Sequence, residues 1–137
     1  MIRAVIDTNI IAFGLLSPSG NESLVLLAAH HGLMRPCLSE AILAEYVGVL
    51  ARPKFAFPQE EIAALIEMLR RNGELFGPYT SAIASPDPDD SKFLHCAIAA
   101  GAEFLITGNK RHFPDATYGK TQIVSAGELL DRITQEV

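Results

Sequence analysis

Hydrophobic positions along the chain fall into two repeating kinds of segment. Short apolar runs that stop at a polar residue are typical of strands buried on both faces of a parallel sheet. The strands expected in this way cover residues 4–6, 33–38, 103–107 and 122–124, and residues 74–84 look extended with a weaker pattern. Apolar residues three and four positions apart fill the segments between these runs, and this spacing predicts helices.

The expected helices begin and end at recognisable local signals. Asn21 and Ser39 are good N-caps, Pro58 suits the first position of a helix, and Ser125 with Glu128 forms a capping-box pattern. With these signals the helices cover residues 10–16, 22–31, 39–51, 58–71, 90–101 and the segment from 125 onward. Strands and helices therefore alternate, which predicts an α/β fold with a parallel sheet and helices on both faces.

Length and composition indicate one globular domain over residues 1–137. Hydrophobic residues make up 49% of the chain and charged residues 20%, and no linker or low-complexity stretch divides it. No apolar run reaches the roughly 18 residues of a membrane span, and Met1 leads directly into the first strand. We therefore expect a cytoplasmic protein without a signal peptide, in which Cys37 and Cys96 are buried, reduced thiols.

The net charge of −5 changes this picture in one respect. A protein that binds nucleic acid without specificity usually has a basic surface, so the acidic balance argues against that class. An enzyme that binds nucleic acid through metal ions is still compatible with it, because the acids of its site count as negative here.

Two acids occupy positions at which a carboxylate needs an explanation. Asp7 directly follows the first strand, and ligands of α/β proteins bind just outside the carboxyl ends of the strands. Asp7 could instead begin a turn or cap the next helix. Glu45 shares a helix face with Ile42, Tyr46 and Val49, where a carboxylate is costly unless it is paired or coordinated. Alternatively, Glu45 lies at the edge of that face and its side chain reaches solvent.

Further oxygen-bearing side chains follow at Asp87, Asp89, Asp90 and Asn109. The chain has no phosphate-binding Gly-x-x-x-x-Gly-Lys motif, no Gly-x-Ser-x-Gly and no His-x-x-x-His. Clustered carboxylates without His or Cys favour Mg²⁺ or Mn²⁺ over Zn²⁺. Such ions activate water and stabilise charge on a phosphoryl group, so these residues indicate phosphate chemistry.

Four stretches of the chain form an ordered set. They read V-I-D-T-N at 5–9, L-S-E-A-I-L-A-E at 38–45, D-P-D-D-S-K-F-L-H-C-A at 87–97 and F-L-I-T-G-N at 104–109. In this order and spacing they make the sequence resemble the PIN-domain family, most closely the VapC-like toxins of bacterial toxin–antitoxin modules. The resemblance implies a three-layer α/β/α sandwich around a parallel sheet of about five strands. It also implies a Mg²⁺- or Mn²⁺-dependent endoribonuclease, the toxin of a type II toxin–antitoxin module.

The resemblance also assigns roles to particular residues. It implies that Asp7, Glu45 and Asp90 hold the metal, and that Thr8 and Asn9 orient Asp7. The choice of Asp90 over its neighbouring acids rests on the apolar residues that follow it at +3, +4 and +7, as in the family's helix. These three acids are therefore the expected catalytic centre.

Asn109 departs from the family pattern, which usually has a fourth acid there, next to Thr107. An amide keeps a carbonyl oxygen but lacks the charge, so we expect weaker metal binding, above all for a second ion. Asp115 is a conceivable substitute. Asp87 and Asp89 fit helix caps or outlying acids better than metal ligands.

The implied partners are an RNA substrate, a cognate antitoxin and a second copy of this chain. The apolar helices at 10–16 and 39–51 are the expected groove for an antitoxin segment. Candidate phosphate contacts are Arg52, Lys54, Lys110 and Arg111. The segment 52–57 could contact RNA with its cations and aromatics, or it could tuck both Phe side chains into the core.

Two other functions stay open at this point. The first is a catalytically weak PIN-like module that binds RNA or an antitoxin, which Asn109 and the acidic balance favour. The second is a different Mg²⁺-dependent phosphatase or nuclease fold. A haloacid-dehalogenase-type enzyme would need Asp-x-Asp after the first strand, and Asn9 does not provide it.

Overall fold

A computed structural model describes residues 1–78 and 88–136 of the chain. The strands are β1 (Ile2–Ile6), β2 (Met34–Ser39), β3 (Glu74–Phe76), β4 (Phe104–Ile106), β5 (Thr117–Tyr118) and β6 (Thr121–Val124). The α-helices are α1 (Thr8–Leu16), α2 (Asn21–His30), α3 (Glu40–Leu50), α4 (Gln59–Asn72), α5 (Ser91–Ala100) and α6 (Ala126–Glu136). Three short 3₁₀ turns are η1 (Pro53–Phe55), η2 (Pro88–Asp90) and η3 (Lys110–His112).

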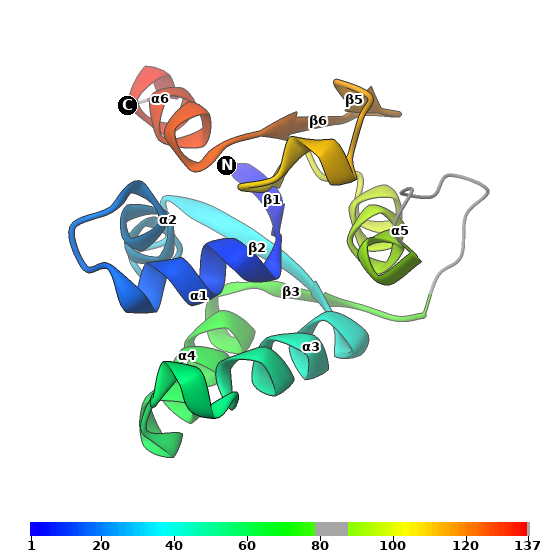
Figure 1. The fold of residues 1–137 in the computed structure, drawn as a ribbon. Helices are drawn as coiled ribbons and strands as arrows, with labels where there is room; N and C mark the ends of the chain where they lie inside the picture. Colours follow the sequence, from blue (N-terminus) through cyan, green and yellow to red (C-terminus); the bar gives the residue numbers. More distant parts are fainter. Residues whose placement is uncertain (79–87, 137) are drawn as a thin grey trace.

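One mixed sheet lies at the centre of the molecule, with strand order β3-β2-β1-β4-β6-β5 (Figure 1). Every neighbouring pair is parallel except β5 and β6. Helix α5 packs against β1, β2, β3 and β4, whereas α1, α2 and α6 lie on the opposite side (Figure 1). The three-layer α/β/α architecture expected from the sequence is therefore confirmed, with six strands instead of about five.

The sixth strand is an antiparallel edge that the hydrophobic pattern does not reveal. Strand β5 has only two residues and pairs with β6 through a hairpin, Tyr118 opposite Thr121. Gly119 provides the positive φ of 60° that such a tight turn needs. A two-residue strand is too short to show an alternation of its own, so it was missed.

Local signals place most helix ends correctly. The Ser39 side chain accepts a hydrogen bond from the Ile42 amide at 3.2 Å, as expected of an N-cap. The Ser125–Glu128 capping box is present in both directions, at 2.8 and 3.1 Å. Two caps differ by one residue, because Gly20 caps α2 in place of Asn21, and Pro58 precedes α4 as its cap.

The core consists of apolar side chains from both helical layers and from the central strands. Cys37 and Cys96 are both buried in it, and burial raises their thiol pKa values to about 11 and about 12. No single helix in residues 1–78 and 88–136 is long and apolar enough to cross a membrane. Helices α1 and α2, bent by 101°, meet that test only as a pair, by length and composition.

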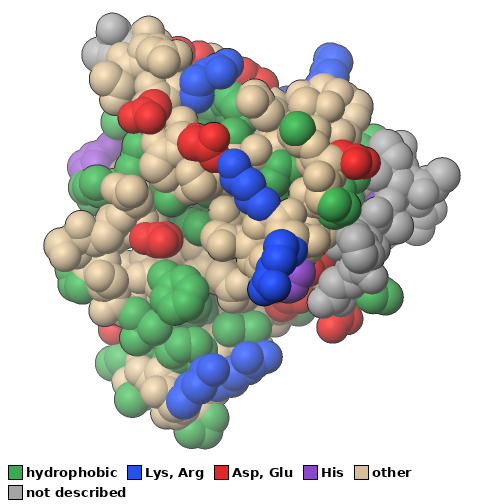
Figure 2. Space-filling view, turned by 45° about the horizontal axis from the view of Figure 1, so that its top comes forward, with side chains coloured by type: hydrophobic (Ala, Val, Ile, Leu, Met, Phe, Trp, Pro, Cys, Tyr) green, Lys and Arg blue, Asp and Glu red, His purple; other side chains and the backbone are tan. Residues whose placement is uncertain are grey.

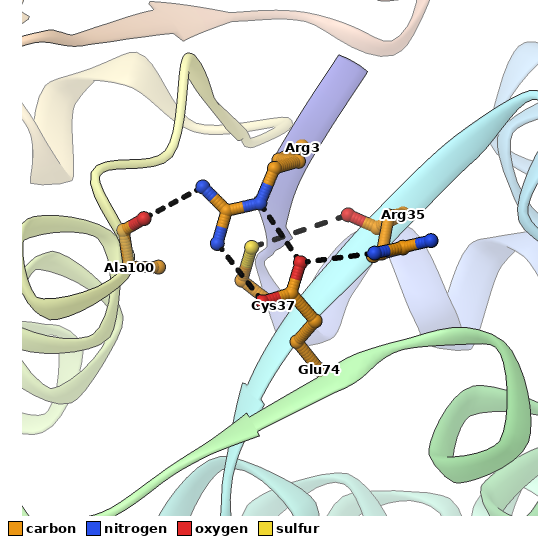
Figure 3. Close-up of polar contacts among 5 residues, drawn as sticks. All are labelled: Arg3, Arg35, Cys37, Glu74 and Ala100. Atoms are coloured by element: carbon orange, nitrogen blue, oxygen red, sulfur yellow. Dashed lines mark hydrogen bonds and ion pairs between the residues drawn. The ribbon is translucent and has the colours of Figure 1, made fainter. Parts of the chain in front are cut away.

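Arg3 of β1 anchors the end of the sheet opposite the carboxyl ends of its strands. Its Nε and Nη2 donate to the two carboxylate oxygens of Glu74 at 2.9 and 3.1 Å, and Nη1 donates to the Ala100 carbonyl at 2.7 Å (Figure 3). The Glu74 hydrogen bond raises the pKa of Arg3, and the same contact lowers the pKa of Glu74. Arg3 thereby joins β1 to β3 and to the last turn of α5, the helix whose first turn follows Asp90.

We expect Arg3→Gln to lower the free energy of unfolding by about 1.5–3 kcal/mol, the range for hydrogen bonds to charged groups. Arg35→Gln is the matched control, because Arg35 reaches Glu74 only once, at 3.4 Å, and is more exposed. The control should change stability by less than about 0.5 kcal/mol. Urea unfolding followed by circular dichroism measures both, and equal losses would contradict the anchoring role of Arg3.

Candidate active site

Asp7 lies where β1 ends and α1 begins, and its side chain is buried. Its Oδ2 accepts a hydrogen bond of 2.7 Å from the hydroxyl of Thr107, which follows the neighbouring strand β4. Asp7 occupies the N-cap position of α1, yet its side chain makes no capping hydrogen bond of the kind that Ser39 makes. The Asp7 side chain therefore does not cap α1 in the way that Ser39 caps α3.

The surroundings of Asp7 disfavour its charged form. Burial raises the pKa of the Asp7 carboxyl, the Thr107 hydrogen bond partly opposes that rise, and the nearby Glu45 carboxylate adds to it. A buried acid next to a second acid is costly in a protein unless a cation is close by. Such an arrangement is common at functional sites.

Glu45 projects from the middle of α3 toward the same place. Thr8 donates its hydroxyl hydrogen to Oε2 of Glu45, and Lys92 Nζ of α5 lies 2.5 Å from Oε1. The two side chains of the ion pair are only 22% (Glu45) and 28% (Lys92) exposed. Glu45 is therefore paired within the protein and does not reach out to solvent.

Asp90 is the buried last residue of η2, immediately before α5. Its Oδ2 lies 2.7 Å from Nδ1 of His112. The other ring nitrogen, Nε2, is 3.1 Å from the Asn109 side-chain amide. The Asn109 backbone amide in turn donates to the Thr107 hydroxyl at 3.0 Å.

These contacts connect three chain segments that are far apart in sequence. A chain of side-chain and backbone-amide contacts runs from Asp90 through His112, Asn109 and Thr107 to Asp7. Glu45 joins from the adjacent side, through the residue that follows Asp7. The four expected site residues thus lie in one connected polar cluster at the carboxyl ends of β1 and β4, although their role as metal ligands stays a prediction.

Several neighbours of the site differ from expectation. Asn9 is exposed on α1, and in the described part of the chain no hydrogen bond joins it to Asp7, so its expected orienting role stays a prediction. The backbone amide of Thr8 contacts the Asp7 carboxylate, but the Thr8 hydroxyl donates its hydrogen bond to Glu45. Asp115 is exposed in a turn where its backbone amide donates to Tyr118 Oη at 3.2 Å. Asp87 lies outside the described residues.

Lys92 and His112 are the site residues that sequence reasoning missed. Both follow an expected site residue closely, Lys92 two positions after Asp90 and His112 three positions after Asn109. A single turn of η2–α5 or of η3 brings each of them back to the cluster. That local proximity was the available signal, but it does not reveal which acid each side chain contacts.

The candidate phosphate contacts are spread over the surface. Lys110 forms an exposed ion pair with Glu128 at 2.6 Å, and this contact lowers the pKa of Glu128 to about 2. Arg52, Lys54 and Arg111 are exposed. Phe55 and Phe57 stack on each other at 5.4 Å and are half-buried against the core, which favours the packing explanation for that segment. On the face drawn in Figure 2, basic, His and acidic side chains adjoin one another to the right of the centre of the view.

The donor set of the site suits a hard cation, because it offers carboxylate oxygens from Asp7, Glu45 and Asp90. In residues 1–78 and 88–136, however, no three His, Cys, Asp or Glu side chains are arranged so as to hold a metal ion. Lys92 and His112 contact two of the three acids instead. The residues therefore fit a divalent metal by the chemistry of their donors, whereas in this structure Lys92 and His112 occupy oxygens of Glu45 and Asp90.

Comparison with known families identifies the family of the chain. The model of the PIN domain family matches residues 3–111, well over half of the chain, so the protein belongs to the PIN domain family. The match includes all four expected site residues and ends just before His112. No curated protein matches the chain. PIN domains are generally metal-dependent nucleases, so this chain has the fold of a nuclease.

Proposed function

We propose that this protein is a metal-dependent endoribonuclease that hydrolyses RNA phosphodiester bonds. The observation that supports it best is the convergence of Asp7, Glu45 and Asp90, from three separate segments, at the carboxyl edge of the sheet of a PIN domain. Ligands of open α/β sheets bind just outside the carboxyl ends of the strands, so acids at that edge are placed for binding or catalysis.

In this proposal Asp7, Glu45 and Asp90 hold Mg²⁺ or Mn²⁺. When bound, the ion would polarise a water for attack on phosphorus and neutralise charge on the phosphodiester. Thr107 fixes the rotamer of Asp7 through its 2.7 Å hydrogen bond, and Thr8 does the same for Glu45. Asn109 is held at the rim by its contacts with Thr107 and His112.

A digest of a mixed-sequence RNA with and without MnCl₂ tests the activity directly. Wild-type protein should cleave only with the metal, leaving 5′-phosphate and 3′-hydroxyl ends, and Asp90→Asn should not cleave. Metal binding without any cleavage would overturn the nuclease proposal. It would favour the alternative of a catalytically weak module that binds RNA or an antitoxin.

Asn109→Asp restores the acid that PIN-like sequences usually carry at this position. We expect it to tighten Mn²⁺ binding by roughly tenfold, which corresponds to about 1.4 kcal/mol, because it adds a charge to the cluster. Asn21→Asp adds the same charge on α2 and should leave the Kd unchanged. Calorimetric titration compares the two, and an unchanged Kd for Asn109→Asp would place that side chain outside the metal site.

We also propose that the protein acts as the toxin of a type II toxin–antitoxin module and forms a homodimer. Exposed apolar side chains support a partner surface: Phe13 and Leu16 on α1 and Val47 on α3 are 52%, 46% and 42% exposed. Figure 2 shows hydrophobic side chains gathered on the lower part of the drawn face. An Arg of an antitoxin segment could reach the acids, since guanidinium pairs bidentately with carboxylate.

Co-expression with the neighbouring reading frame, followed by purification through a tag on this chain, tests the partner proposal. A small protein should co-purify, and expression of this chain alone should slow growth. Light scattering of the chain alone should give the mass of a dimer. Normal growth without any co-purifying protein would overturn the toxin role, and the nuclease proposal would then rest on cleavage alone.

A further inference from the structure

We propose that the Lys92 ammonium holds the metal position at Glu45 through its ion pair with that carboxylate in the metal-free protein, and that a divalent metal displaces it on binding. The proposal rests on the proposed metal site and assigns that site a competitor within the chain itself. Lys92 is a positioning residue in this view, because it acts on metal loading through Glu45.

The position of Lys92 is fixed from both sides. It is the second residue of α5, two positions after Asp90, and its Nζ lies over the ring of Phe93, 6.0 Å from the ring centre. Its ammonium lies 2.5 Å from Oε1 of Glu45 on α3. The ion pair therefore bridges α3, which carries Glu45, and α5, which begins directly after Asp90.

Both carboxylate oxygens of Glu45 are engaged in this state. Oε1 accepts from Lys92 and Oε2 accepts from Thr8. A metal ion at Glu45 needs one of these oxygens, and the Thr8 contact comes from a neutral hydroxyl. The ammonium is the competing partner, because two cations on one carboxylate repel each other at short range.

The ammonium also has space into which it can withdraw. Lys92 lines a cavity of about 440 Å³ between α3, β3 and α5, together with Ser39, Phe76 and His95. Because this cavity is open to solvent, the flexible four-carbon side chain can turn its ammonium toward water at the cavity mouth without any change in the helix itself. Metal binding can thus exchange one cation for another at Glu45 while the fold stays as it is.

The exchange sets how readily the site takes up metal. Because Lys92 neutralises Glu45, the metal-free site carries less repulsion than three bare acids would. The metal must displace this contact, so Lys92 weakens apparent metal affinity. By reciprocity, bound metal loosens the Lys92–Glu45 pair to the same extent.

Calorimetric titration of EDTA-treated protein with MnCl₂ tests the exchange through binding, independently of cleavage. Lys92→Gln removes the competing charge, and we expect its Kd to be roughly 5- to 100-fold lower than that of the wild type, a usual range for coupled sites. Lys120→Gln makes the same change of net charge at the β5–β6 hairpin and should leave the Kd unchanged. Lys92→Arg keeps the charge and should bind no tighter than the wild type.

A second measurement follows Lys92 in the wild-type protein, and the charge-preserving variant Lys92→Arg serves only to assign its resonance. Reductive ¹³C-methylation labels the lysines and keeps their charge. The Lys92 resonance, identified by its absence in Lys92→Arg, should shift on addition of Mg²⁺, while the Lys120 resonance should not. The proposal would be overturned by an unchanged or higher Kd for Mn²⁺ in folded Lys92→Gln. It would also be overturned if the Lys92 resonance did not shift on addition of Mg²⁺. Loss of RNA cleavage with metal binding intact would remove the nuclease proposal but not this one.

Discussion

Asp7→Asn is expected to remove both metal binding and RNA cleavage while making the metal-free protein more stable. Asn keeps the shape and can still accept from Thr107, but it cannot supply the charge that a divalent ion needs. Cleavage should fall by more than roughly 100-fold, which is the upper end for residues that only support a metal ligand. RNA digestion and calorimetric titration measure these losses, and near-native values would exclude Asp7 from the site.

The gain in stability has a definite pH dependence. Burial holds the pKa of Asp7 above its unfolded value, so the native state favours the protonated carboxyl. The stabilisation that comes from the protonated Asp7 carboxyl is fully present below the pKa that Asp7 has in the unfolded chain. It is lost as the pH rises through the raised pKa that Asp7 has in the native protein. The difference in stability between Asp7→Asn and the wild type should therefore grow across this window and stay constant above it.

Urea unfolding in EDTA at a series of pH values from 4 to 8 measures this difference. Saturating Mn²⁺ should reverse the order of the two proteins, because only the wild type gains stability from a bound ligand. A metal-free Asp7→Asn protein that is less stable than the wild type at neutral pH would indicate a purely structural role for the carboxylate.

Much of this fold follows from the sequence because its signals are local. The run that ends at Asp7 and the cap at Ser39 each depend on a few adjacent residues. The parallel order of the central strands follows from the alternation of strands and helices. The short β5 hairpin departs from that alternation, and only Gly119 marks it.

The site was predictable in its acids but not in its contacts. Asp7 stands at a strand end, and the resemblance to PIN domains singled out Glu45 and Asp90. Periodicity alone left Glu45 undecided between solvent and a partner. Its actual partner, Lys92, comes from a helix 47 positions further along the chain, and such a pairing depends on how α3 and α5 pack. The contact of His112 with Asp90 likewise joins two separate segments, η3 and η2, and depends on how they are placed in the fold.

Tyr46 is expected to contribute most to the stability of the site's framework. It is completely buried on α3, and its hydroxyl donates to the Ile6 carbonyl, the last residue of β1. Burial first, and then the nearby Asp7 carboxylate, raise the Tyr46 pKa well above its ordinary value, so the hydroxyl stays a donor. Tyr46 thus joins the helix that carries Glu45 to the strand that ends at Asp7.

Tyr46→Ala should lower the free energy of unfolding by about 3–5 kcal/mol, as for other large buried aromatics, through the cavity that it creates. Tyr46→Phe keeps the ring and should cost only about 1–2 kcal/mol, because it leaves the Ile6 carbonyl without its donor. The Phe variant should remain folded but bind Mn²⁺ more weakly, since α3 is no longer tied to the end of β1. Urea unfolding and calorimetric titration separate the two effects. Unchanged metal affinity in folded Tyr46→Phe would mean that ring packing alone positions Glu45 beside Asp7.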